Sequence, residues 1–480
     1  MSPRLRIAAL VALTLAVPGR SPMAAPRPNV LFFFTDDQRA DTIGALGNPH
    51  VITPTLDRLA ESGFVFRNAY VMGSNVGGVC LPSRNMLLSG RAYFRFHDDV
   101  AAGKPTRAYA SPEKPNFPDS MKQAGYVAYH HGKRGNVARL IHPRFDYTKY
   151  VQHYALDPKA PYPDEPGKEI VDAAIEFLTH RPDDRPFFIY LAPACPHDPR
   201  VAADRYLRRY DRRRIPLPEN YRPLHPFDNG ELVIRDELLA PWPRTREEIG
   251  RHLHEYYAVI TAMDGHFGRL LQTLKERGEY ENTIIIFSSD NGLALGSHGL
   301  MGKQSLYEHS SKVPLLFAGP GIPPGQTDAL VYLLDVFPTV CDLVGAPIPE
   351  GLDGRSLAPV IRGQTDKVRD TLFTAYRQSQ RALRDGRWKL IRYPLIDHAQ
   401  LFDLGADPLE MHNLADDPAQ AERIERMTGL IRQWQGQLGD QAPLDMAEPG
   451  PREFVPPAGA ELDALLKRWR MGRDRKRLPR

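Results

Sequence analysis

The segment Asn29–Phe34, NVLFFF, is an almost unbroken apolar run, and two aspartates follow it directly. Such a run is typical of a strand buried on both faces, as in parallel sheets that helices cover on both sides. Similar runs recur at Phe187–Leu191 and Thr283–Ser288, with helical patterns between them. This alternation predicts an α/β fold with a mostly parallel central sheet and helices on both faces.

Start and stop signals locate the remaining elements of this sheet and its helices. Thr53-Pro54 predicts the start of a helix that Gly63 ends, because threonine is a good N-cap and proline suits the first turn. Helices are also expected at 83–88, 117–124, 169–179 and 247–276, and strands at 64–70, 126–129 and 313–318.

The pattern changes near Thr371. Arg381–Tyr393 predicts two short strands joined at Asp385-Gly386, which is a hairpin signal. Leu401–Leu404 predicts another strand and Ala421–Leu438 a helix. We therefore expect a large domain at 26–370, a smaller α+β domain with a short antiparallel sheet at 371–440, and an irregular Pro-rich and basic tail at 441–480.

Residues 1–25 predict a secretion signal. Arg4 and Arg6 form a basic start, Ile7–Val17 is a short apolar run, and Ala24-Ala25 offers small residues near a cleavage point. The apolar run is too short to span a bilayer, and no later segment is apolar enough to do so. The mature chain is expected in the periplasm or outside the cell, without membrane attachment. A net charge of +4 over 480 residues gives no reason to expect a nucleic-acid partner.

Polar side chains directly follow four of the predicted strands. They are Asp36 and Asp37, Lys133, His197, and Asp290 and Asn291. Ligands of parallel sheets bind beyond the carboxyl ends of the strands, so we expect these side chains to gather at one edge. The carboxylate and amide oxygens of Asp36, Asp37, Asp290 and Asn291 favour a hard cation, with Ca²⁺ ahead of Mg²⁺.

Cys80 begins the segment Cys80-Leu81-Pro82-Ser83-Arg84. Arg84 lies four residues after Cys80, so a helix would place both on one face, where the arginine can orient a nucleophile at position 80. The alternative interpretation is a buried structural cysteine before a proline turn. Sequence leaves open whether the other two cysteines, Cys195 and Cys341, form a disulfide.

The segment around Cys80 resembles the signature of type I sulfatases, the formylglycine-dependent enzymes of the alkaline-phosphatase-like superfamily. Gly77-Gly78-Val79 precedes it and Leu87–Arg91 follows it. Other motifs of the family recur in the expected order between about Asn29 and Asp416. They are Gly132-Lys133, Pro196–Pro199, Gly302–His309, Arg387–Leu390, Leu401–Leu404 and Glu410–Leu414.

The resemblance implies hydrolysis of a sulfate ester, on a sulfated carbohydrate or a small sulfate ester. A formylglycine-generating enzyme would convert Cys80 into an aldehyde. One hydroxyl of the aldehyde hydrate attacks sulfur, and deprotonation of the other then expels sulfate. Residue 80 would join Asp36, Asp37, Asp290 and Asn291 around the cation. By position, Arg84 would hold the nucleophile, Lys133 and Lys303 would bind sulfate oxygens, and His197 with Lys303 would protonate the leaving alcohol.

One position departs from the family pattern. Gly135 stands where G-K-W-H carries the histidine that acts as base on the formylglycine hydroxyl. His130, His131 or water would have to replace this base, or sulfate release would be slow, since general bases typically contribute ~10²–10⁴-fold. A catalytically impaired protein that binds sulfated glycans is therefore one alternative. A phosphatase or phosphodiesterase of the same superfamily is another, although these usually carry serine or threonine as the nucleophile.

Two segments after His197 bear on the substrate. Seven arginines crowd a predicted helix: Arg200, Arg205, Arg208, Arg209, Arg212, Arg213 and Arg214. They form a solvated basic surface or, alternatively, a rim that attracts a polyanionic glycan. Pro216–Pro243, rich in proline and aromatic residues, predicts a long loop over the site, and such loops often set specificity.

Overall fold

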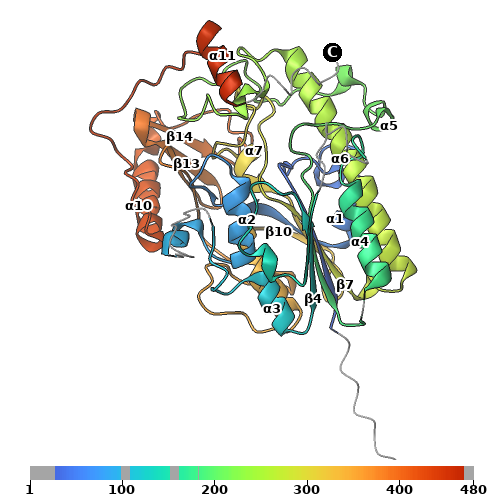
Figure 1. The fold of residues 1–480 in the computed structure, drawn as a ribbon. Helices are drawn as coiled ribbons and strands as arrows, with labels where there is room; N and C mark the ends of the chain where they lie inside the picture. Colours follow the sequence, from blue (N-terminus) through green and yellow to red (C-terminus); the bar gives the residue numbers. More distant parts are fainter. Residues whose placement is uncertain (1–26, 99–108, 152–161, 182, 470–480) are drawn as a thin grey trace, which may run out of the picture.

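The computed structural model describes residues 27–98, 109–151, 162–181 and 183–469. The predicted secretion signal lies outside these ranges, as does the end of the predicted basic tail. Figure 1 shows a large sheet, viewed nearly edge-on, with helices on both faces and a smaller sheet beside its upper end. Within the described ranges, no helix has both the length and the apolar character needed to cross a bilayer.

The large sheet contains nine strands, and most neighbours run parallel. In spatial order its main path is β10 (Gly325–Tyr332), β2 (Phe64–Tyr70), β9 (Leu315–Ala318), β7 (Thr283–Ser289), β1 (Asn29–Thr35), β6 (Phe187–Ala192), β4 (Val127–Gly132) and β5 (Tyr147–Tyr150). β9 runs antiparallel to β2 and β7, and the short β8 (Lys312–Val313) runs antiparallel to β2. The expected mostly parallel α/β sheet is confirmed.

The register of the three central strands brings their carboxyl ends to the same level. Phe33 of β1 lies opposite Leu191 of β6 and Phe287 of β7. Beyond the strands, the amide of Asp36 donates to the carbonyl of Cys195 at 3.1 Å, and the amide of Asp290 donates to that of Thr35 at 3.2 Å. The segments that follow β1, β6 and β7 therefore meet at one edge.

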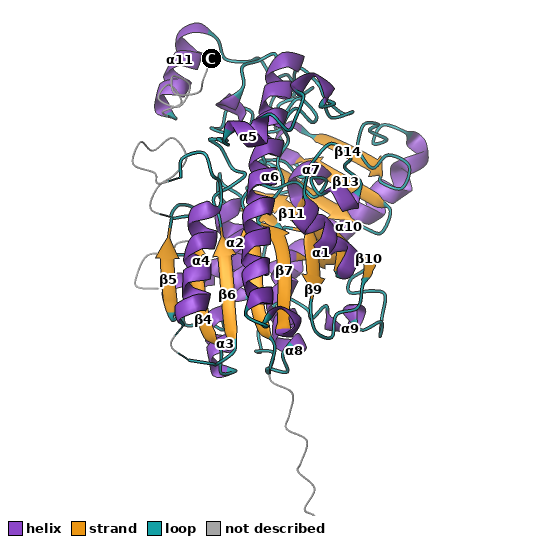
Figure 2. Ribbon diagram, turned by 90° about the vertical axis from the view of Figure 1, so that its right-hand side faces the viewer, coloured by secondary structure: helices purple, strands orange, loops and turns teal. Residues whose placement is uncertain are grey.

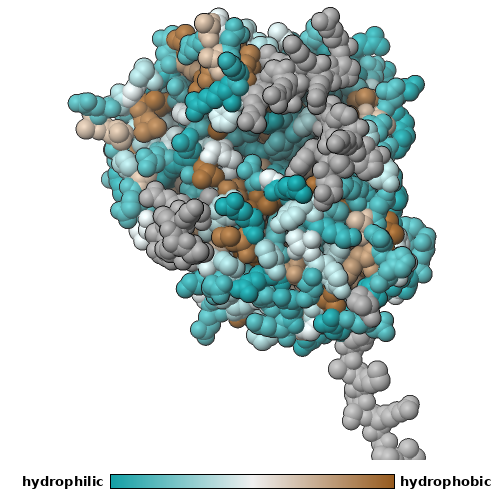
Figure 3. Space-filling view, viewed as in Figure 1, coloured by the Kyte–Doolittle hydropathy of each residue, from teal (hydrophilic) through white to brown (hydrophobic). Residues whose placement is uncertain are grey.

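Helices cover both faces of the large sheet because its strands alternate two sets of apolar side chains. Leu31 and Phe33 pack toward α1 (Pro54–Ser62), α4 (Lys168–His180) and α6 (Arg246–Glu276), the face seen in Figure 2. Phe32 and Phe34 belong to the opposite core, with α2 (Cys80–Ser89), α3 (Phe117–Gln123) and α8 (Val336–Leu343). The face of the molecule drawn in Figure 3 is mainly hydrophilic, with hydrophobic side chains in scattered small patches.

The start of α1 depends on α6 as well as on its own residues. Thr53 occupies the predicted N-cap position but makes no side-chain cap hydrogen bond. The buried carboxylate of Asp264 in α6 accepts instead from the amides of Thr55 and Leu56, at 3.0 and 2.8 Å. Burial raises the pKa of Asp264 to about 6.

A second sheet of five strands lies beside the first. Its order is β14 (His398–Asp403), β13 (Trp388–Tyr393), β12 (Gln380–Arg384), β11 (Leu372–Tyr376) and β3 (Gly73–Ser74), and α10 (Ala421–Leu438) packs on it. The predicted hairpin at Asp385-Gly386 is confirmed, since β12 and β13 pair antiparallel. β3, however, comes from the segment just before Cys80 and pairs parallel to β11. One apolar core extends from the large sheet into this second sheet.

Three local predictions are corrected. Residues 313–318 are not one strand, because Pro314 separates β8 from β9. Only α5 (Asp204–Leu207) and a 3-10 turn at 212–214 replace the helix expected around the arginines after His197, since α5 has no buried face. The predicted irregular tail contains a helix, α11 (Gly459–Arg468).

Candidate active site

Cys80 is the first residue of α2 and is fully buried. Its Sγ lies 3.3 Å from Asp36 Oδ1, 3.6 Å from Asp37 Oδ1 and 3.0 Å from Lys303 Nζ. The helix thus begins three residues earlier than Ser83, its predicted start. Because Cys80 opens the helix, the amides and the positive dipole end of α2 lie beside the candidate nucleophile.

Four side chains form a compact cluster of metal-ligand type. Ligand atoms of Asp36, Asp37, Cys80 and Asp290 all lie within 4.8 Å of one another. The Asn291 amide nitrogen donates to Asp37 Oδ1 at 2.7 Å, which adds the fifth residue of the predicted metal site. The structure therefore brings together residues that are separated by more than 200 positions in the sequence.

Three buried cations balance the three carboxylates. Lys133 forms an ion pair with Asp36, and Lys303 Nζ lies 2.6 Å from Asp37 Oδ1. Arg84 lies between two acids: its Nε is 2.9 Å from Asp290 Oδ2 and its Nη2 is 3.1 Å from Asp36 Oδ2. The predicted shared face of positions 80 and 84 is thus realised.

The buried charges shift one another's pKa values. Burial alone would raise the pKa of Asp36, but Lys133 and Arg84 hold it well below its usual range. Burial lowers the pKa of Lys303 less than Asp37 and its other anionic neighbours raise it, so the ammonium stays charged. Burial, followed by Asp290 and Asp36, raises the pKa of the Cys80 thiol well above its ordinary value. An unmodified thiol at this position is therefore protonated and a weak nucleophile.

The donor set fits a hard divalent cation. Three carboxylates and one carboxamide converge here, and oxygen donors of this kind suit Ca²⁺ or Mg²⁺. Asn291 Oδ1 is buried and has no hydrogen-bond partner among the described residues, so it is free to act as a ligand. An oxygen at position 80 would complete this set better than the softer thiol sulfur.

His197 presents one ring nitrogen to the cluster. Its Nδ1 lies 2.6 Å from the carbonyl oxygen of Asp198, to which it donates. Nε2 therefore faces Asp37, with 3.8 Å between Nε2 and Asp37 Oδ2. The hydrogen bond to Asp198 thus fixes which of the two ring nitrogens points toward the cluster.

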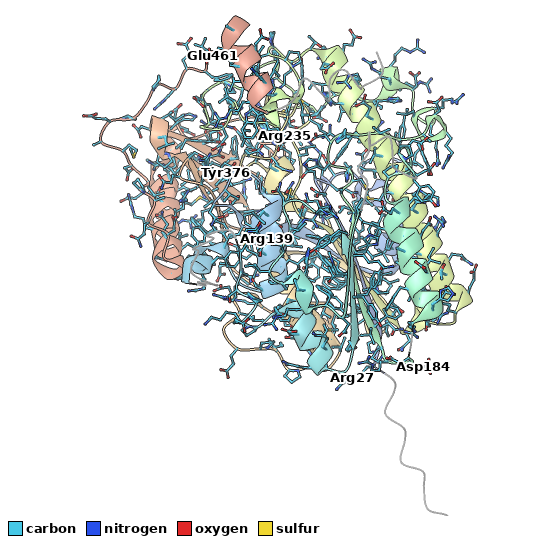
Figure 4. All side chains as sticks on the ribbon, in the orientation of Figure 1. Arg27, Arg139, Asp184, Arg235, Tyr376 and Glu461 are labelled. Atoms are coloured by element: carbon cyan, nitrogen blue, oxygen red, sulfur yellow. The ribbon has the colours of Figure 1, made fainter. Side chains whose placement is uncertain are left out.

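Sequence reasoning missed a chain of polar contacts from the loop at 216–243. Arg235 holds the carboxylate of Asp198 with both Nη atoms and lies 3.0 Å from Asp236. Asp236 in turn accepts from Gln304 Nε2 at 2.8 Å. The loop thus links the residue after His197 to the residue after Lys303. Figure 4 shows Arg235 near the upper end of α2, whereas Arg27 and Asp184 lie at the opposite end of the sheet.

A second residue of the same loop, Glu237, also holds the backbone that carries Lys303. The buried carboxylate of Glu237 accepts from the amides of Met301 and Gly302, the latter at 2.8 Å. Arg244, also buried, forms an ion pair with Glu237. From sequence, the length of the loop and its proline and aromatic content predicted that it lies over the site. They did not single out Glu237 or Arg244, because loop residues have no periodic pattern.

The second sheet fixes the rest of this segment. Gln380 of β12 donates to the carbonyl of Gln304 at 3.1 Å and accepts from the amide of Leu306 at 3.2 Å. Glu308 lies 3.0 Å from Lys389, and Lys389 lies 2.8 Å from Glu410. These acids and the lysine form a largely buried ion network, which Arg384 joins at 2.9 Å from Glu308.

Gly135 leaves open space near the cluster. A Cβ built at this position would have no atom within 4 Å. The glycine lines a cavity of about 280 Å³ together with Lys133, His197 and residues of the segments 162–167 and 193–201. Among the described residues, no side chain therefore contacts the position where the histidine's Cβ would lie.

Neither neighbouring histidine takes over this position. His130 is fully buried beside His142, and burial lowers its pKa well below the ordinary value. Burial also lowers the pKa of His131, to about 4. Within the described residues, neither ring makes a hydrogen bond or ion pair with Cys80. All three cysteines are free, so Cys195 and Cys341 do not pair.

Comparison with known proteins is consistent with this geometry. The profile of the family described as Sulfatase matches residues 28–346, and that described as N-sulphoglucosamine sulphohydrolase, C-terminal, matches residues 296–437. An N-acetylglucosamine-6-O-sulfatase of Bacteroides thetaiotaomicron is 27% identical, with 87% of this chain and 88% of the relative covered. A choline-sulfatase of Rhizobium meliloti is 28% identical, with 82% and 84% covered.

Solved structures agree in fold. A protein in complex with its substrate, D-glucosamine-2-N,6-O-disulfate, is 24% identical and superposes with a TM-score of 0.70, over 88% of this chain and all of that one. A phosphonate monoester hydrolase of Silicibacter pomeroyi, 25% identical, gives a TM-score of 0.69, with 86% of this chain and 96% of that one covered. The family match spans well over half of the sequence. The chain therefore belongs to the type I sulfatases of the alkaline-phosphatase-like superfamily and is a sulfuric ester hydrolase.

Proposed function

We propose that the protein hydrolyses a sulfate ester of a carbohydrate, with Cys80 converted to formylglycine and a divalent cation, Ca²⁺ rather than Mg²⁺, bound beside it. The observation that carries the proposal is the packing of Cys80 Sγ against Asp36, Asp37 and Lys303, at 3.0–3.6 Å, at the carboxyl edge of the sheet. Sγ marks the place that the oxygens of the modified residue would take.

The buried charges suit an anionic ester. Three carboxylates face three cations, so a bound divalent cation leaves the cluster with a formal excess of two positive charges. This excess matches the single negative charge of a sulfate monoester plus that of a deprotonated nucleophile. When bound, the cation supplies Lewis-acid polarisation of a sulfate oxygen. The hydrated aldehyde supplies one hydroxyl for attack and a second whose deprotonation releases sulfate.

The chain's own residues hold the reacting groups. Arg84 is fixed by Asp36 and Asp290 and orients residue 80 from the same helix face. Lys133 and Lys303 bind the sulfate oxygens. His197, whose Nδ1 is anchored on the carbonyl of Asp198, protonates the leaving alcohol from Nε2.

The carbohydrate part of the proposal is supported by relatives. The profile matching residues 296–437 is that of an N-sulphoglucosamine sulphohydrolase, and relatives from Bacteroides thetaiotaomicron and Homo sapiens are named N-acetylglucosamine-6-sulfatases. Export through residues 1–25, with the periplasm or the extracellular space as destination, would place the enzyme where sulfated polysaccharides occur. Maturation would require a formylglycine-generating enzyme as partner.

A phosphoryl or phosphonyl ester is the second candidate substrate. Two phosphonate monoester hydrolases share the fold, at 22–25% identity. The substrate panel should therefore include a phosphate monoester and a phosphonate monoester. A protein that binds but does not turn over sulfated glycans, the reading that Gly135 suggests, would bind members of the panel without releasing sulfate.

The test starts with maturation. The chain is produced together with a formylglycine-generating enzyme, and the peptide containing Cys80 is analysed by mass spectrometry. Sulfate release is then measured with N-acetylglucosamine 6-sulfate, p-nitrophenyl sulfate and the two phosphorus esters, with and without Ca²⁺. We expect release from the sulfate esters only, dependent on both the modification and the cation.

Cys80→Ala should abolish sulfate release while preserving the thermal midpoint within a few degrees. Cys341→Ala is the matched control, because Cys341 is also buried but lies in α8, outside the cluster. Equal activity of wild type and Cys80→Ala would reject the proposal, as would sulfate release from protein whose Cys80 is entirely unmodified.

A further inference from the structure

A second positively charged position lies beside the active site, at the turn between β11 and β12. Arg377 has a left-handed backbone, with φ 44°, which is uncommon for a residue other than glycine. Its side chain is 50% exposed. Strained backbone of this kind is found preferentially at functional positions, so the side chain's surroundings are informative.

A buried acid orients this arginine. Arg377 Nη1 donates to Glu231 Oε1 at 2.5 Å, and the Glu231 side chain is only 6% exposed. Glu231 is the sole hydrogen-bond partner of the guanidinium within the described part of the chain. The remaining N–H groups of Arg377 are therefore free to bind an oxyanion.

Arg377 lines a polar cleft of about 830 Å³. Its walls include the exposed side chains Gln378 and Gln441, the buried Ser379, and the stacked rings of Tyr93 and Phe94. A volume of this size accommodates more than one sugar ring, and polar groups beside an aromatic surface are suited to carbohydrate.

Residues at the turn that carries Arg377 contact the segment that precedes the nucleophile. The amide of Arg377 donates to the carbonyl of Ser74 at 2.6 Å. The hydroxyl of Tyr376 donates at 2.9 Å to the carbonyl of Gly77, three residues before Cys80. The same carbonyl accepts from Gln304, the neighbour of Lys303. Figure 4 shows Tyr376 near the upper end of α2, which is the end where Cys80 lies.

The arginines after His197, for which a glycan-attracting rim was the alternative to a solvated basic surface, are less suited to this role. Arg200 is buried, and most of the exposed ones lie beside a carboxylate of their own. These pairs are Arg205 with Glu165, Arg208 with Asp204, Arg212 with Glu247, and Arg213 and Arg214 with Asp211. A carboxylate partner also offsets the charge of Arg377, so what distinguishes Arg377 is its place in the wall of the cleft, which none of the arginines after His197 lines.

We propose that Arg377 and this cleft bind a second anionic group of the substrate, a carboxylate or another sulfate on the glycan whose ester is hydrolysed at Cys80. The inference rests on the proposed function and adds a substrate class, namely glycans with at least two negative groups. A bidentate arginine contact recognises either oxyanion, and the choice of probe distinguishes them.

The test measures discrimination. The ratio of kcat/KM for a doubly charged substrate to that for N-acetylglucosamine 6-sulfate is determined with the mature wild type and with Arg377→Ala. One doubly charged probe is glucosamine-2-N,6-O-disulfate, and the other is a uronate-containing disaccharide with a single sulfate. We expect the ratio to fall about 10- to 100-fold in the variant, as for loss of a charged hydrogen bond. The probe with the larger fall identifies the oxyanion.

Arg387→Ala is the matched control. Arg387 is also half or more exposed, follows a hairpin turn of the same sheet and pairs with a carboxylate, Asp403, yet it does not line the cleft. Its ratio should stay within twofold of the wild type. Titration calorimetry of Cys80→Ala, with and without Arg377→Ala, measures binding of the same probes independently of turnover.

The outcomes separate the two proposals. Sulfate release from the monosulfated sugar together with an unchanged ratio and unchanged affinity would overturn only the role of Arg377. Absence of sulfate release from every ester by fully modified protein would overturn the proposed function itself. An equal fall for Arg387→Ala would show a general effect of surface charge and would also reject the cleft.

Discussion

The ion network between Glu308 and the second sheet allows a quantitative prediction. Lys389 Nζ lies 2.8 Å from Glu410 Oε1 and 3.0 Å from Glu308 Oε1, and its side chain is 2% exposed. The substitution Lys389→Met keeps the length of the side chain but removes the cation between two buried carboxylates. Breaking a buried ion pair in this way costs about 3–5 kcal/mol of the free energy of unfolding, and we expect a loss in this range at pH 8.

The loss should be smaller at low pH because Glu410 can take up a proton. Burial raises the pKa of Glu410 from 4.5 to about 7, even though Lys389 lowers it. A carboxyl whose pKa is raised by folding stabilises the fold fully below its unfolded pKa, and this stabilisation is lost as the pH rises through the folded pKa. Without Lys389 the folded pKa rises further, so the variant retains the proton at pH 5 and loses it only above pH 7.

The assay is urea denaturation followed by circular dichroism at pH 5 and pH 8. The variants are Lys389→Met, the double variant Lys389→Met/Glu410→Gln, and Lys367→Met as a control on an exposed lysine. The control should stay within about 0.5 kcal/mol of the wild type. The double variant should recover most of the loss at pH 8, since one of the two carboxylates is gone. A loss at pH 8 below roughly 1 kcal/mol, or one independent of both pH and Glu410, would refute the reasoning.

Three further predictions concern the metal site, Gly135 and Asp264. Ca²⁺ at 100 times its dissociation constant should stabilise the wild type by about 2.7 kcal/mol, and a chelator should reverse this; Asp290→Asn should abolish the gain in thermal midpoint. The Cβ of Gly135→His would meet no described atom within 4 Å, and the histidine should speed sulfate release, so a pre-steady-state burst of alcohol seen in the wild type should be smaller in this variant, whereas Gly135→Ala should leave the burst unchanged. Burial raises the pKa of Asp264 to about 6, so its stabilisation is complete below pH 3.8 and is lost as the pH rises through 6. The free energy of unfolding should fall by about 3 kcal/mol in this way. Denaturation curves of Asp264→Asn, measured between pH 4 and pH 7, should not show this fall.

The central strands and the residues after them were predictable because burial leaves a strong local pattern. β1, β6 and β7 are buried at every position and each contains a continuous apolar run, and parallel pairing then brings Asp36, His197 and Asp290 to one edge. Spacing on a helix was enough to align Cys80 with Arg84.

The parts that sequence reasoning missed depend on contacts distant in the chain. β3 is two residues long and becomes a strand only because β11 lies beside it. β5 and β10 are partly exposed strands at the two edges of the large sheet, so they lack the continuous apolar pattern of the centre. Arg235 and Asp236 have no periodic context, and their role appears only when Asp198 and Gln304 converge on them.

The second sheet helps to position the segment that follows Lys303 in the candidate active site. Sequence placed the boundary of the large domain at residue 370, and every side chain predicted to contact sulfate precedes that residue. Yet Gln380 holds the backbone at Gln304 and Leu306, and Lys389 holds the side chain of Glu308. A lysine that must meet sulfate within hydrogen-bond reach tolerates little displacement, because a misplacement of about 1 Å can cost ~10²-fold in rate. A chain cut at the predicted boundary would keep Lys303 and the contacts that Glu237 and Asp37 make with its segment, but it would lose the contacts of Gln380 and Lys389 with the residues that follow. We therefore expect the motifs after residue 380 to affect catalysis through the position of this one ammonium group.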